Sequence, residues 1–400
     1  MTPPTPRPVV GMLIYANPDH YPPTVNAVHL LARSCELRIV GRNMGTADRS
    51  YPRGVRIERL GSPGSARDRE RASAAAKLSE YAGFIVRAAT LLSDADVLYA
   101  YDAFAFVAAC LLQMASSHPP ALIYQSHEIE HELPPLSTLR GWVVRLERAW
   151  ARRADLIVFP DAERAARFAR TAALERPPLV VPNYPLRELF AACPDLDKLI
   201  PQRLDHPVVL YRGTISGAAA AEEIVRATAL LRPPTKTLLV GFPGGFSGNE
   251  LAQLAEAAGV AQRCSYAGIL PYADLQPLTL AAAVGLSLYK GTTFDRAATT
   301  TAANKIYEYA ACGLPVVVSD LPGYRKVFEH ATWIRFANPF DPASIAKAVQ
   351  ALLDDPQEYA RACRDARTAF ETNLTYEIAF APVLEWIREH EAPRRRADTA

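Results

Sequence analysis

Asn304, Lys305 and Glu308 lie close together in a predicted alanine-rich helix that begins near Ala302 and ends at Gly313. Lys305 and the unpaired backbone N–H groups of the first helical turn favour an anion. The Glu308 carboxylate, one turn later, can accept two hydrogen bonds from a ribose diol. Because a phosphate and a ribose are neighbours in any nucleotide, this spacing suits a nucleotide. A surface Lys/Glu pair, worth only about 0.2–0.5 kcal/mol, is the alternative interpretation.

His127 directly follows the apolar run 121–126. It therefore lies at the carboxyl end of a predicted strand, which is where sheets of parallel strands bind their ligands. An imidazole at that place can donate a hydrogen bond to a sugar hydroxyl or to a departing diphosphate. A hydrogen-bonded structural histidine is the alternative.

The stretch from His127 to His131 also matches H-E-x-x-H, the zinc-binding helix of metalloproteases. That motif needs both histidines on one face of a helix. A strand ends just before it and Pro134 follows soon after, so the helix has little room. A zinc-dependent hydrolase is kept as an alternative function, and no metal site is predicted.

The loop that follows the first predicted strand carries Asp19, His20 and Thr24 before a helical stretch. These side chains can hydrogen-bond an acceptor substrate. A proline-stiffened loop with Thr24 as a helix cap is the alternative. The loop lacks G-x-G-x-x-G, which argues against a dinucleotide cofactor in this half. A non-catalytic or NAD-binding two-domain protein remains a second alternative.

Short apolar runs alternate with helical patterns along the whole chain. Strands covered on both faces by helices are apolar throughout, so these runs indicate parallel sheets. The predicted strands are 9–15, 36–41, 55–60, 96–101, 121–126, 155–160, 179–183, 207–212, 236–241, 264–268, 284–289, 314–319 and 332–336. The segment 183–206 interrupts the rhythm with three prolines and is predicted to connect two α/β domains, each a doubly wound parallel sheet.

Length, net charge and cysteine content limit the kinds of function that this chain can have. A chain of 400 residues exceeds what one hydrophobic core usually supports, so two domains are expected. The net charge of +2 predicts no nucleic-acid affinity. Six scattered cysteines indicate reduced thiols. With neither a signal peptide at the first residues nor an unbroken apolar span, a cytoplasmic location is expected.

The motif in the second half resembles the donor-site signature of the family-4 (retaining) glycosyltransferases of GT-B fold. The matching residues are Asn304-Lys305-x-x-Glu308-Tyr309-x-x-x-Gly313-x-Pro315-Val316-Val317. Flanking pieces are similar to the family in the same order: 122–132, 145–160, 210–217, 238–241 and 266–275.

The resemblance implies two Rossmann-like domains that face a central cleft. Residues 1–190 would form an acceptor domain, completed by a C-terminal crossing helix at 375–391. Residues 205–374 would form the domain that binds the nucleotide-sugar donor.

The resemblance also implies roles for single residues. His127, Arg212 and Lys305 are the expected catalytic residues, the last two neutralising the diphosphate together. The donor would be bound by Gly213, Thr214, Gly241, Gly268, Ile269, Thr300, Asn304 and Glu308. Two departures from the family pattern occur. Thr300 stands where many members have an acid, and Arg212 precedes the first glycine instead of following it.

The activity implied is transfer of a hexose-type sugar from a nucleoside-diphosphate sugar, UDP-sugar by preference, to an unknown acceptor with retention of anomeric configuration. Neither a metal nor another cofactor is required in that scheme. A peripheral membrane contact through the basic helix 140–153 is less favoured than a solvated helical face.

Overall fold

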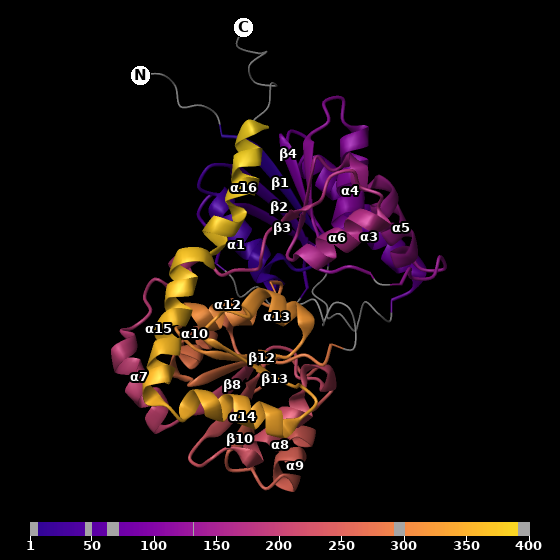
Figure 1. Ribbon diagram of the computed structural model, residues 1–400. Coiled ribbons are helices and arrows are strands. Elements are labelled where there is room, and N and C mark those ends of the chain that lie inside the picture. The colour runs from indigo at the N-terminus through magenta and orange to yellow at the C-terminus, as the bar shows by residue number, and fades with distance from the viewer. Residues whose placement is uncertain (1–6, 45–49, 62–71, 131, 292–300, 391–400) are drawn as a thin grey trace, which may run out of the picture. The chain divides into compact units, whose positions relative to one another are not determined.

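The computed structural model describes residues 7–44, 50–61, 72–130, 132–291 and 301–390 (Figure 1). The chain divides into two compact units. Unit 1 comprises Met1–Pro182 and Ala379–Ala400, and unit 2 comprises Asn183–Ile378.

The described part of unit 1 contains a seven-stranded parallel sheet in the order β3-β2-β1-β4-β5-β6-β7. The chain order reverses between β1 and β4, which is the strand order of a Rossmann fold. The strands are β1 (Val9–Ile14), β2 (Glu36–Arg42), β3 (Arg56–Leu60), β4 (Val97–Tyr101), β5 (Ala121–Gln125), β6 (Leu156–Phe159) and β7 (Leu179–Val180).

Helices cover both faces of this sheet, and for that reason strands such as β1 and β4 are buried along their whole length. On one face α3, α4 and α5 pack together. The helices of this unit are α1 (Pro22–Leu31), α3 (Ala74–Leu91), α4 (Asp102–Ala115), α5 (Leu139–Trp150) and α6 (Ala162–Thr171).

Unit 2 repeats the same architecture with six described strands in the order β10-β9-β8-β11-β12-β13. All neighbouring strands pair in parallel. The strands are β8 (Val208–Arg212), β9 (Lys236–Val240), β10 (Cys264–Tyr266), β11 (Val284–Ser287), β12 (Val316–Ser319) and β13 (Ile334–Ala337). Every apolar run predicted as a strand forms one, and the predicted fold class is confirmed: two Rossmann-like sheets, as in GT-B proteins.

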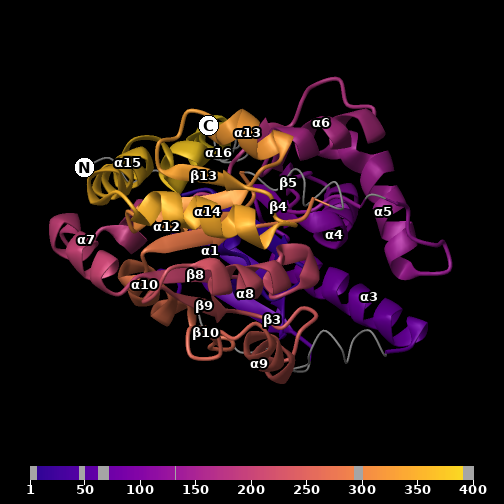
Figure 2. The ribbon, with the colours of Figure 1, turned by 60° about the horizontal axis from the view of Figure 1, so that its bottom comes forward.

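The helices of unit 2 form two layers. In Figure 2 the sheet of unit 2 lies among its helices, with α8 packed against α14 and α12 against α15. The helices are α7 (Leu196–Asp205), α8 (Ala221–Leu230), α9 (Gly248–Ala257), α10 (Tyr272–Ala281), α12 (Asn304–Ala311), α13 (Pro322–Phe328), α14 (Pro342–Leu353) and α15 (Pro356–Asn373).

The segment 183–206, predicted as a connection, is packed into unit 2. Its helix α7 carries Arg203, which is 1% exposed. The Arg203 guanidinium donates hydrogen bonds to the carbonyls of Leu280, Cys312 and Gly313 at 2.7–2.9 Å. Bonds to three carbonyls from other parts of unit 2 fix this segment to that unit, which no local sequence pattern indicates.

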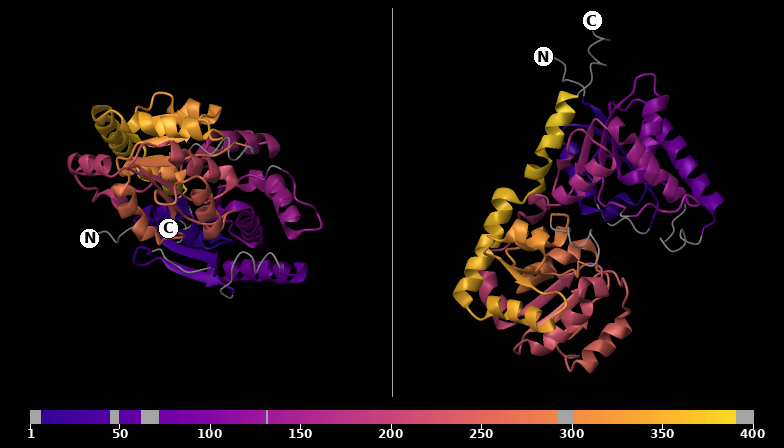
Figure 3. Two further views of the ribbon diagram at one scale, coloured as in Figure 1. Left: turned by 90° about the horizontal axis from the view of Figure 1, so that it is seen from below. Right: turned by 45° about the vertical axis from the view of Figure 1, so that its right-hand side comes forward.

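The last described helix, α16 (Tyr376–Glu389), begins in unit 2 and belongs to unit 1 from Ala379 onward. Phe380 stacks with Tyr99 of β4 at 6.4 Å between ring centroids, so the helix is part of the packing of the first sheet. Figure 3 shows α16 running beside the strands of unit 1. Among the helices described here, none combines the length and the apolar character needed to span a bilayer.

Candidate functional site

The carboxyl edge of the unit 2 sheet is lined by glycine loops. Gly213 follows β8 and Gly241 follows β9, with φ values of 133° and 135° that only glycine adopts readily. The Gly241 N–H donates to the carbonyl of Gly268, which follows β10, at 2.8 Å. A Cβ atom on Gly241 would lie 2.0 Å from the Gly213 carbonyl oxygen. The loops after β8, β9 and β10 therefore pack backbone against backbone, and a side chain at Gly241 is excluded.

Lys305 lies at this edge, in the first turn of α12. Its Nζ atom is 3.0 Å from the position that a Gly213 Cβ would take. The ammonium lies over the rings of Tyr211 and Tyr289, at 4.2 and 4.9 Å from their centroids. Among the described residues, no carboxylate lies within ion-pair distance of Lys305. The structure thus holds one positive charge against the first glycine loop without neutralising it.

The start of α12 reinforces this positive potential. Its N-cap residue Ala303 offers no side-chain hydrogen bond, so the dipole of the helix is not capped by an acid or a hydroxyl. Asn304 Oδ1 is buried and has no hydrogen-bond partner in the described structure. An unsatisfied buried acceptor beside uncapped N–H groups is the pattern expected where a ligand completes the bonding.

Glu308 lies one turn further and is 4% exposed. Its Oε1 accepts a hydrogen bond from the Tyr272 hydroxyl at 2.8 Å, and its Oε2 accepts one from the Arg212 Nη2 at 2.5 Å. Each oxygen has a second lone pair, so the carboxylate can still accept from a diol. The two partners fix the orientation of the Glu308 carboxyl group.

Arg212 was predicted to neutralise a diphosphate, but in the structure its guanidinium is bound to side chains of the protein. Its guanidinium binds Glu308 and also donates to the Thr279 hydroxyl at 2.8 Å. Burial is the largest single influence and opposes the charge of Arg212, but Glu308 and neighbouring ionisable groups together outweigh it, and the pKa of Arg212 is raised above its usual value. Its charge is therefore compensated inside the protein, because a buried guanidinium without an acid beside it is costly.

The remaining donor-side predictions occupy the same edge or lie outside the described residues. Thr214 is exposed and continues the loop of Gly213. Ile269 is exposed by 66% directly after Gly268. Thr300 lies outside the described residues. The sheet thus brings together Gly213, Gly241, Gly268, Lys305 and Glu308, whereas the sequence predictions missed Tyr272, although it lies in the flanking stretch 266–275.

In unit 1, His127 follows β5 and is 6% exposed. Its ring stacks with those of Tyr21 and Tyr101, at centroid distances of 4.7 and 5.6 Å. Its Nε2 lies 3.4 Å from the Thr24 hydroxyl, while its Nδ1 is buried without a hydrogen-bond partner. Burial lowers the pKa of His127, against an opposing effect of Asp102. A neutral imidazole with one unsatisfied nitrogen is suited to bind a hydroxyl.

Asp102 supports this histidine and was missed by the sequence predictions. It follows β4 with φ of 62°, a left-handed conformation that aspartate adopts more readily than most residues. Its Oδ1 accepts a hydrogen bond from the backbone N–H of His127 at 2.8 Å. Its place at the end of the predicted strand 96–101 was a visible signal, since neighbouring strands end at one edge.

Two residues predicted on the acceptor side, Asp19 and His20, do not contact His127 in the described structure. The Asp19 carboxylate is buried and accepts hydrogen bonds from Arg59 at 3.0 Å and from the Tyr51 hydroxyl at 2.5 Å. An internal ion pair thus orients the Asp19 carboxylate, and its role toward an acceptor stays a prediction. His20 is exposed, with Nε2 3.3 Å from Asn17 Nδ2. Neither contacts His127 among the described interactions, whereas Thr24 does.

The zinc interpretation of the segment from His127 is not supported by its backbone. Residues 127–130 are not helical, so the helical face that H-E-x-x-H requires is not formed. His131 lies outside the described residues. Within the described parts of the chain, no group of three or more His, Cys, Asp or Glu side chains is arranged to hold a metal ion.

Part of this chain is similar in sequence to known proteins. Residues 206–355 match the family model described as "Glycosyl transferases group 1". A segment of 166 residues is 28% identical to the D-inositol 3-phosphate glycosyltransferase of Thermobispora bispora. This match covers 39% of the present chain and 37% of that relative, so it spans well under half of the relative's length.

Solved structures share the fold over nearly the whole chain. The sucrose-phosphate synthase of Thermosynechococcus elongatus superposes with a TM-score of 0.73 at 17% identity, over 96% of this chain and 99% of that one. HepE of Anabaena, solved in complex with UDP and glucose, superposes with a TM-score of 0.70 at 16% identity, over 95% and 99%.

Proposed function

We propose that this chain, whose residues 206–355 match the group 1 glycosyl transferase model and whose fold is GT-B, transfers a hexose from a UDP-sugar to an acceptor with retention of anomeric configuration. The observation that carries the proposal is the position of Lys305. Its ammonium lies against the glycine loop after β8, without a carboxylate partner among the described residues, three positions before the carboxylate of Glu308.

Lys305 and Glu308 bind different parts of the donor in this proposal. The diphosphate lies beside the loop of Gly213, against which the Lys305 ammonium is held, and Lys305 neutralises it. The Glu308 carboxylate accepts hydrogen bonds from the ribose hydroxyls. Arg212 and Tyr272 act as positioning residues, because both are bound to Glu308 and hold its orientation.

The chemistry requires stabilisation of a leaving diphosphate. Negative charge grows on the UDP oxygens as the bond to the sugar breaks. Lys305 and the uncapped N-terminus of α12 are fixed before the reaction, so they stabilise that charge without reorganisation. In the retaining scheme implied by the family resemblance, the departing phosphate accepts the proton of the acceptor hydroxyl. By the same resemblance, His127 is the histidine that donates a hydrogen bond to the donor sugar or to the departing diphosphate. We also propose that no metal ion is needed.

Binding of UDP to the Lys305→Ala variant tests the central observation. We expect its affinity, measured by isothermal titration calorimetry, to fall about 10- to 100-fold, as for loss of a charge-assisted contact. Lys236→Ala is the matched control, since Lys236 is exposed at the opposite end of β9. Equal UDP affinity in Lys305→Ala and the native protein would refute the donor site.

The reaction itself is tested with UDP-glucose. Slow hydrolysis in the absence of an acceptor should release glucose whose first anomer, observed by proton NMR, is the anomer of the donor. The rate should be unchanged by EDTA. An inverted first product contradicts retention, and inhibition by EDTA contradicts metal independence.

Donor choice and the alternative functions are separated by thermal shift. Stabilisation by UDP above GDP, ADP and dTDP supports the proposed donor. Stabilisation by NAD but not by UDP would favour the NAD-binding alternative. The hydrolase alternative requires loss of activity in both EDTA-treated protein and the His131→Ala variant.

A further inference from the structure

Helix α3 of unit 1 is apolar on its exposed face as well as on its buried face. Tyr81, Phe84 and Ala88 are buried, and the helix packs against β2, α4 and α5. On the other side, Leu78 is 57% and Val86 is 67% exposed. Figure 2 shows α3 at the outer margin of this unit. A helix that is apolar on both faces is typical of one that is covered on both, which indicates a partner for the exposed face.

The exposed apolar residues form one continuous stripe. Ala75, Leu78, Ala82, Val86 and Ala89 are all exposed, and three or four positions separate each from the next. Residues at that spacing lie on one side of a helix, so the five side chains are neighbours along α3. Small side chains at the middle and at both ends of the stripe leave room for side chains of a second helix.

The exposed face of α3 carries little charge. Among the exposed residues of this helix, which the structure describes over its whole length, Arg87 alone is charged, and Glu58 of β3 accepts hydrogen bonds from it at 2.6 and 3.1 Å. Helix α15 has the same length, but its exposed residues include Glu358, Arg361 and Arg364. Charged residues are depleted in the cores of protein interfaces, so α3 suits an interface and α15 suits solvent.

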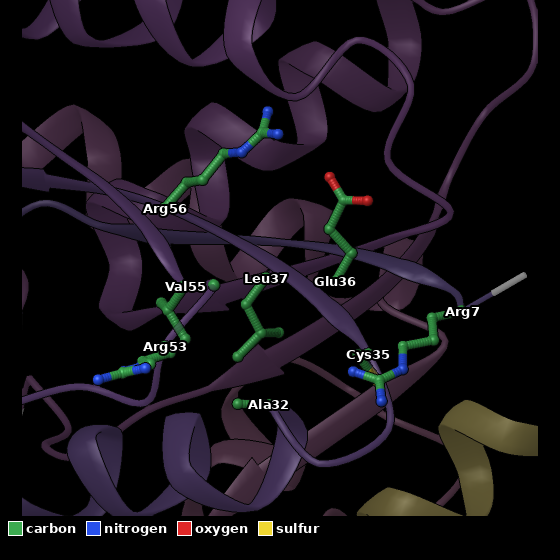
Figure 4. A pocket seen from close by; sticks show the side chains of 9 residues that line it. Arg7, Ala32, Cys35, Glu36, Leu37, Arg53, Val55 and Arg56 are labelled. Carbon is green, nitrogen blue, oxygen red and sulfur yellow. The ribbon is translucent and has the colours of Figure 1, made fainter.

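A hollow at the amino ends of β1, β2 and β3 has the opposite character. Its volume is about 480 Å³, and Figure 4 shows Arg7, Arg53 and Arg56 around it with their guanidinium groups pointing in different directions. Its lining residue Leu37 is 1% exposed. Scattered charges above buried apolar side chains favour contact with solvent, so this hollow does not extend the apolar stripe of α3.

The stripe has the same order of residues from either end. Leu78 and Val86 lie four positions from Ala82, and Ala75 and Ala89 lie seven positions from it. A twofold axis through Ala82 therefore sets Leu78 of each copy against Val86 of the other, and Ala75 against Ala89. This reciprocal relation is the one that a twofold symmetric dimer requires, so the stripe is complementary to a second copy of itself.

The segments of unit 1 outside the described residues do not match the stripe in composition. Segments 45–49, 62–71 and 391–400 contain no Val, Ile, Leu, Met, Phe, Tyr or Trp, and segment 1–6 contains only Met1. Segment 62–71, which precedes α3, ends in the charged run Arg-Asp-Arg-Glu-Arg. Burying such charges on an apolar stripe is unfavourable, so a second copy is the better occupant.

We propose that two copies of this chain form a twofold symmetric dimer in which their α3 helices pack antiparallel and cross at Ala82. A helix of 18 residues is about 27 Å long and 10 Å wide, so two such faces bury less than the roughly 800 Å² per partner of a stable dimer. The dimer therefore dissociates readily and forms at protein concentrations above about 10 µM. It is independent of sugar transfer, because no residue of the stripe belongs to the proposed donor site.

Sedimentation equilibrium of the full chain between about 1 and 300 µM measures this association. The native chain should pass from monomer to dimer over that range. Leu78→Glu/Val86→Glu sets carboxylates against each other in the dimer and should raise the dissociation constant at least about tenfold. Both side chains are exposed, so the variant should keep the melting temperature of the native monomer. A native chain that stays monomeric throughout overturns the proposal.

Two further variants test the pairing and the place of the contact. Leu78→Glu/Val86→Lys sets each new carboxylate opposite the new ammonium of the other copy, so it should dimerise at least about tenfold more tightly than Leu78→Glu/Val86→Glu. Leu230→Glu/Val327→Glu replaces two side chains of unit 2 that are 57% and 44% exposed, and it should dimerise as the native chain does. Equal dimerisation by the two α3 variants, or a weakened dimer in the unit 2 variant, overturns the proposal.

A lipid surface is the other occupant that an uncharged apolar stripe fits. Sedimentation of the native chain with phosphatidylcholine vesicles tests it, with Leu78→Glu/Val86→Glu as the comparison. Vesicle binding that only the native chain shows, together with a monomeric native chain in solution, assigns the stripe to a membrane and overturns the dimer. A native chain that dimerises without binding vesicles supports the proposal.

Discussion

The two sheets of this protein have the same strand order, but the residues that follow the carboxyl ends of their strands differ in chemical character. In unit 2 a glycine follows β8 and another follows β9, and Lys305 lies against the loop of Gly213. In unit 1 the corresponding edge is filled by side chains, with His127 stacked on Tyr21 and Tyr101. The first arrangement presents a positive charge beside packed glycine loops, whereas the second presents a single neutral nitrogen. Topology thus places a site, and the residues that end the strands decide what it binds.

Breaking the buried ion pair between Arg212 and Glu308 should have the largest effect on stability. Glu308→Ala leaves the buried guanidinium of Arg212 uncompensated, so the free energy of unfolding should fall by about 3–5 kcal/mol in urea denaturation. The double variant Arg212→Met/Glu308→Leu removes both charges and should recover most of that loss without recovering UDP binding. Recovery of UDP binding would show that Glu308 does not contact the nucleotide.

The glycine edge of unit 2 is tested next by Gly241→Ala. The added Cβ meets backbone at 2.0 Å and the φ of 135° is unfavourable for alanine, so we expect a loss of about 2–4 kcal/mol. Gly54→Ala in unit 1 is the matched control. Gly54 also has a positive φ, of 94°, but its Cβ would meet nothing within 4 Å, and the loss should be about 1 kcal/mol. Similar losses would refute crowding as the cause.

A buried acid in unit 1 predicts that stability depends on pH. Burial raises the pKa of Glu147 to about 7, with the Tyr124 hydroxyl bound to it. The folded state therefore keeps a proton that the unfolded state releases, and stability falls as pH rises from about 4.5 to 7. Glu147→Gln should remove this dependence and be more stable than the native protein by up to about 3 kcal/mol at pH 8.

Denaturation of Glu147→Gln at pH 5 and pH 8 measures this effect. The exposed Glu132→Gln is the control and should follow the native pH profile. A Glu147→Gln variant that retains the native profile would assign the pH dependence to other groups.

The smallest effect is expected for Asp102, which supports His127. Asp102→Asn keeps both the left-handed backbone and an oxygen for the His127 N–H, so stability should change by less than about 1 kcal/mol. Asp102→Ala loses that hydrogen bond and should cost about 1–2 kcal/mol. If thermal unfolding shows equal stability for both variants, the Asp102–His127 contact does not stabilise unit 1.

The sequence predicted the strands well because each is a short apolar run bounded by a polar turn. Lys305 and Glu308 could be assigned to one site from the sequence, since they lie one helical turn apart. Arg212 could not be paired with Glu308, because 96 positions separate them. The ion pair between Asp19 and Arg59 could not be predicted either, because 40 positions separate the two residues.

The sequence by itself determined the local features of this protein: two series of parallel strands, the glycines that end them, and a helix that starts with a lysine and carries an acid one turn later. Only the tertiary structure decided which charges are compensated. Arg212 is neutralised by Glu308 while Lys305 remains unpaired among the described residues, because ion pairing depends on distances through space that the order of residues does not encode.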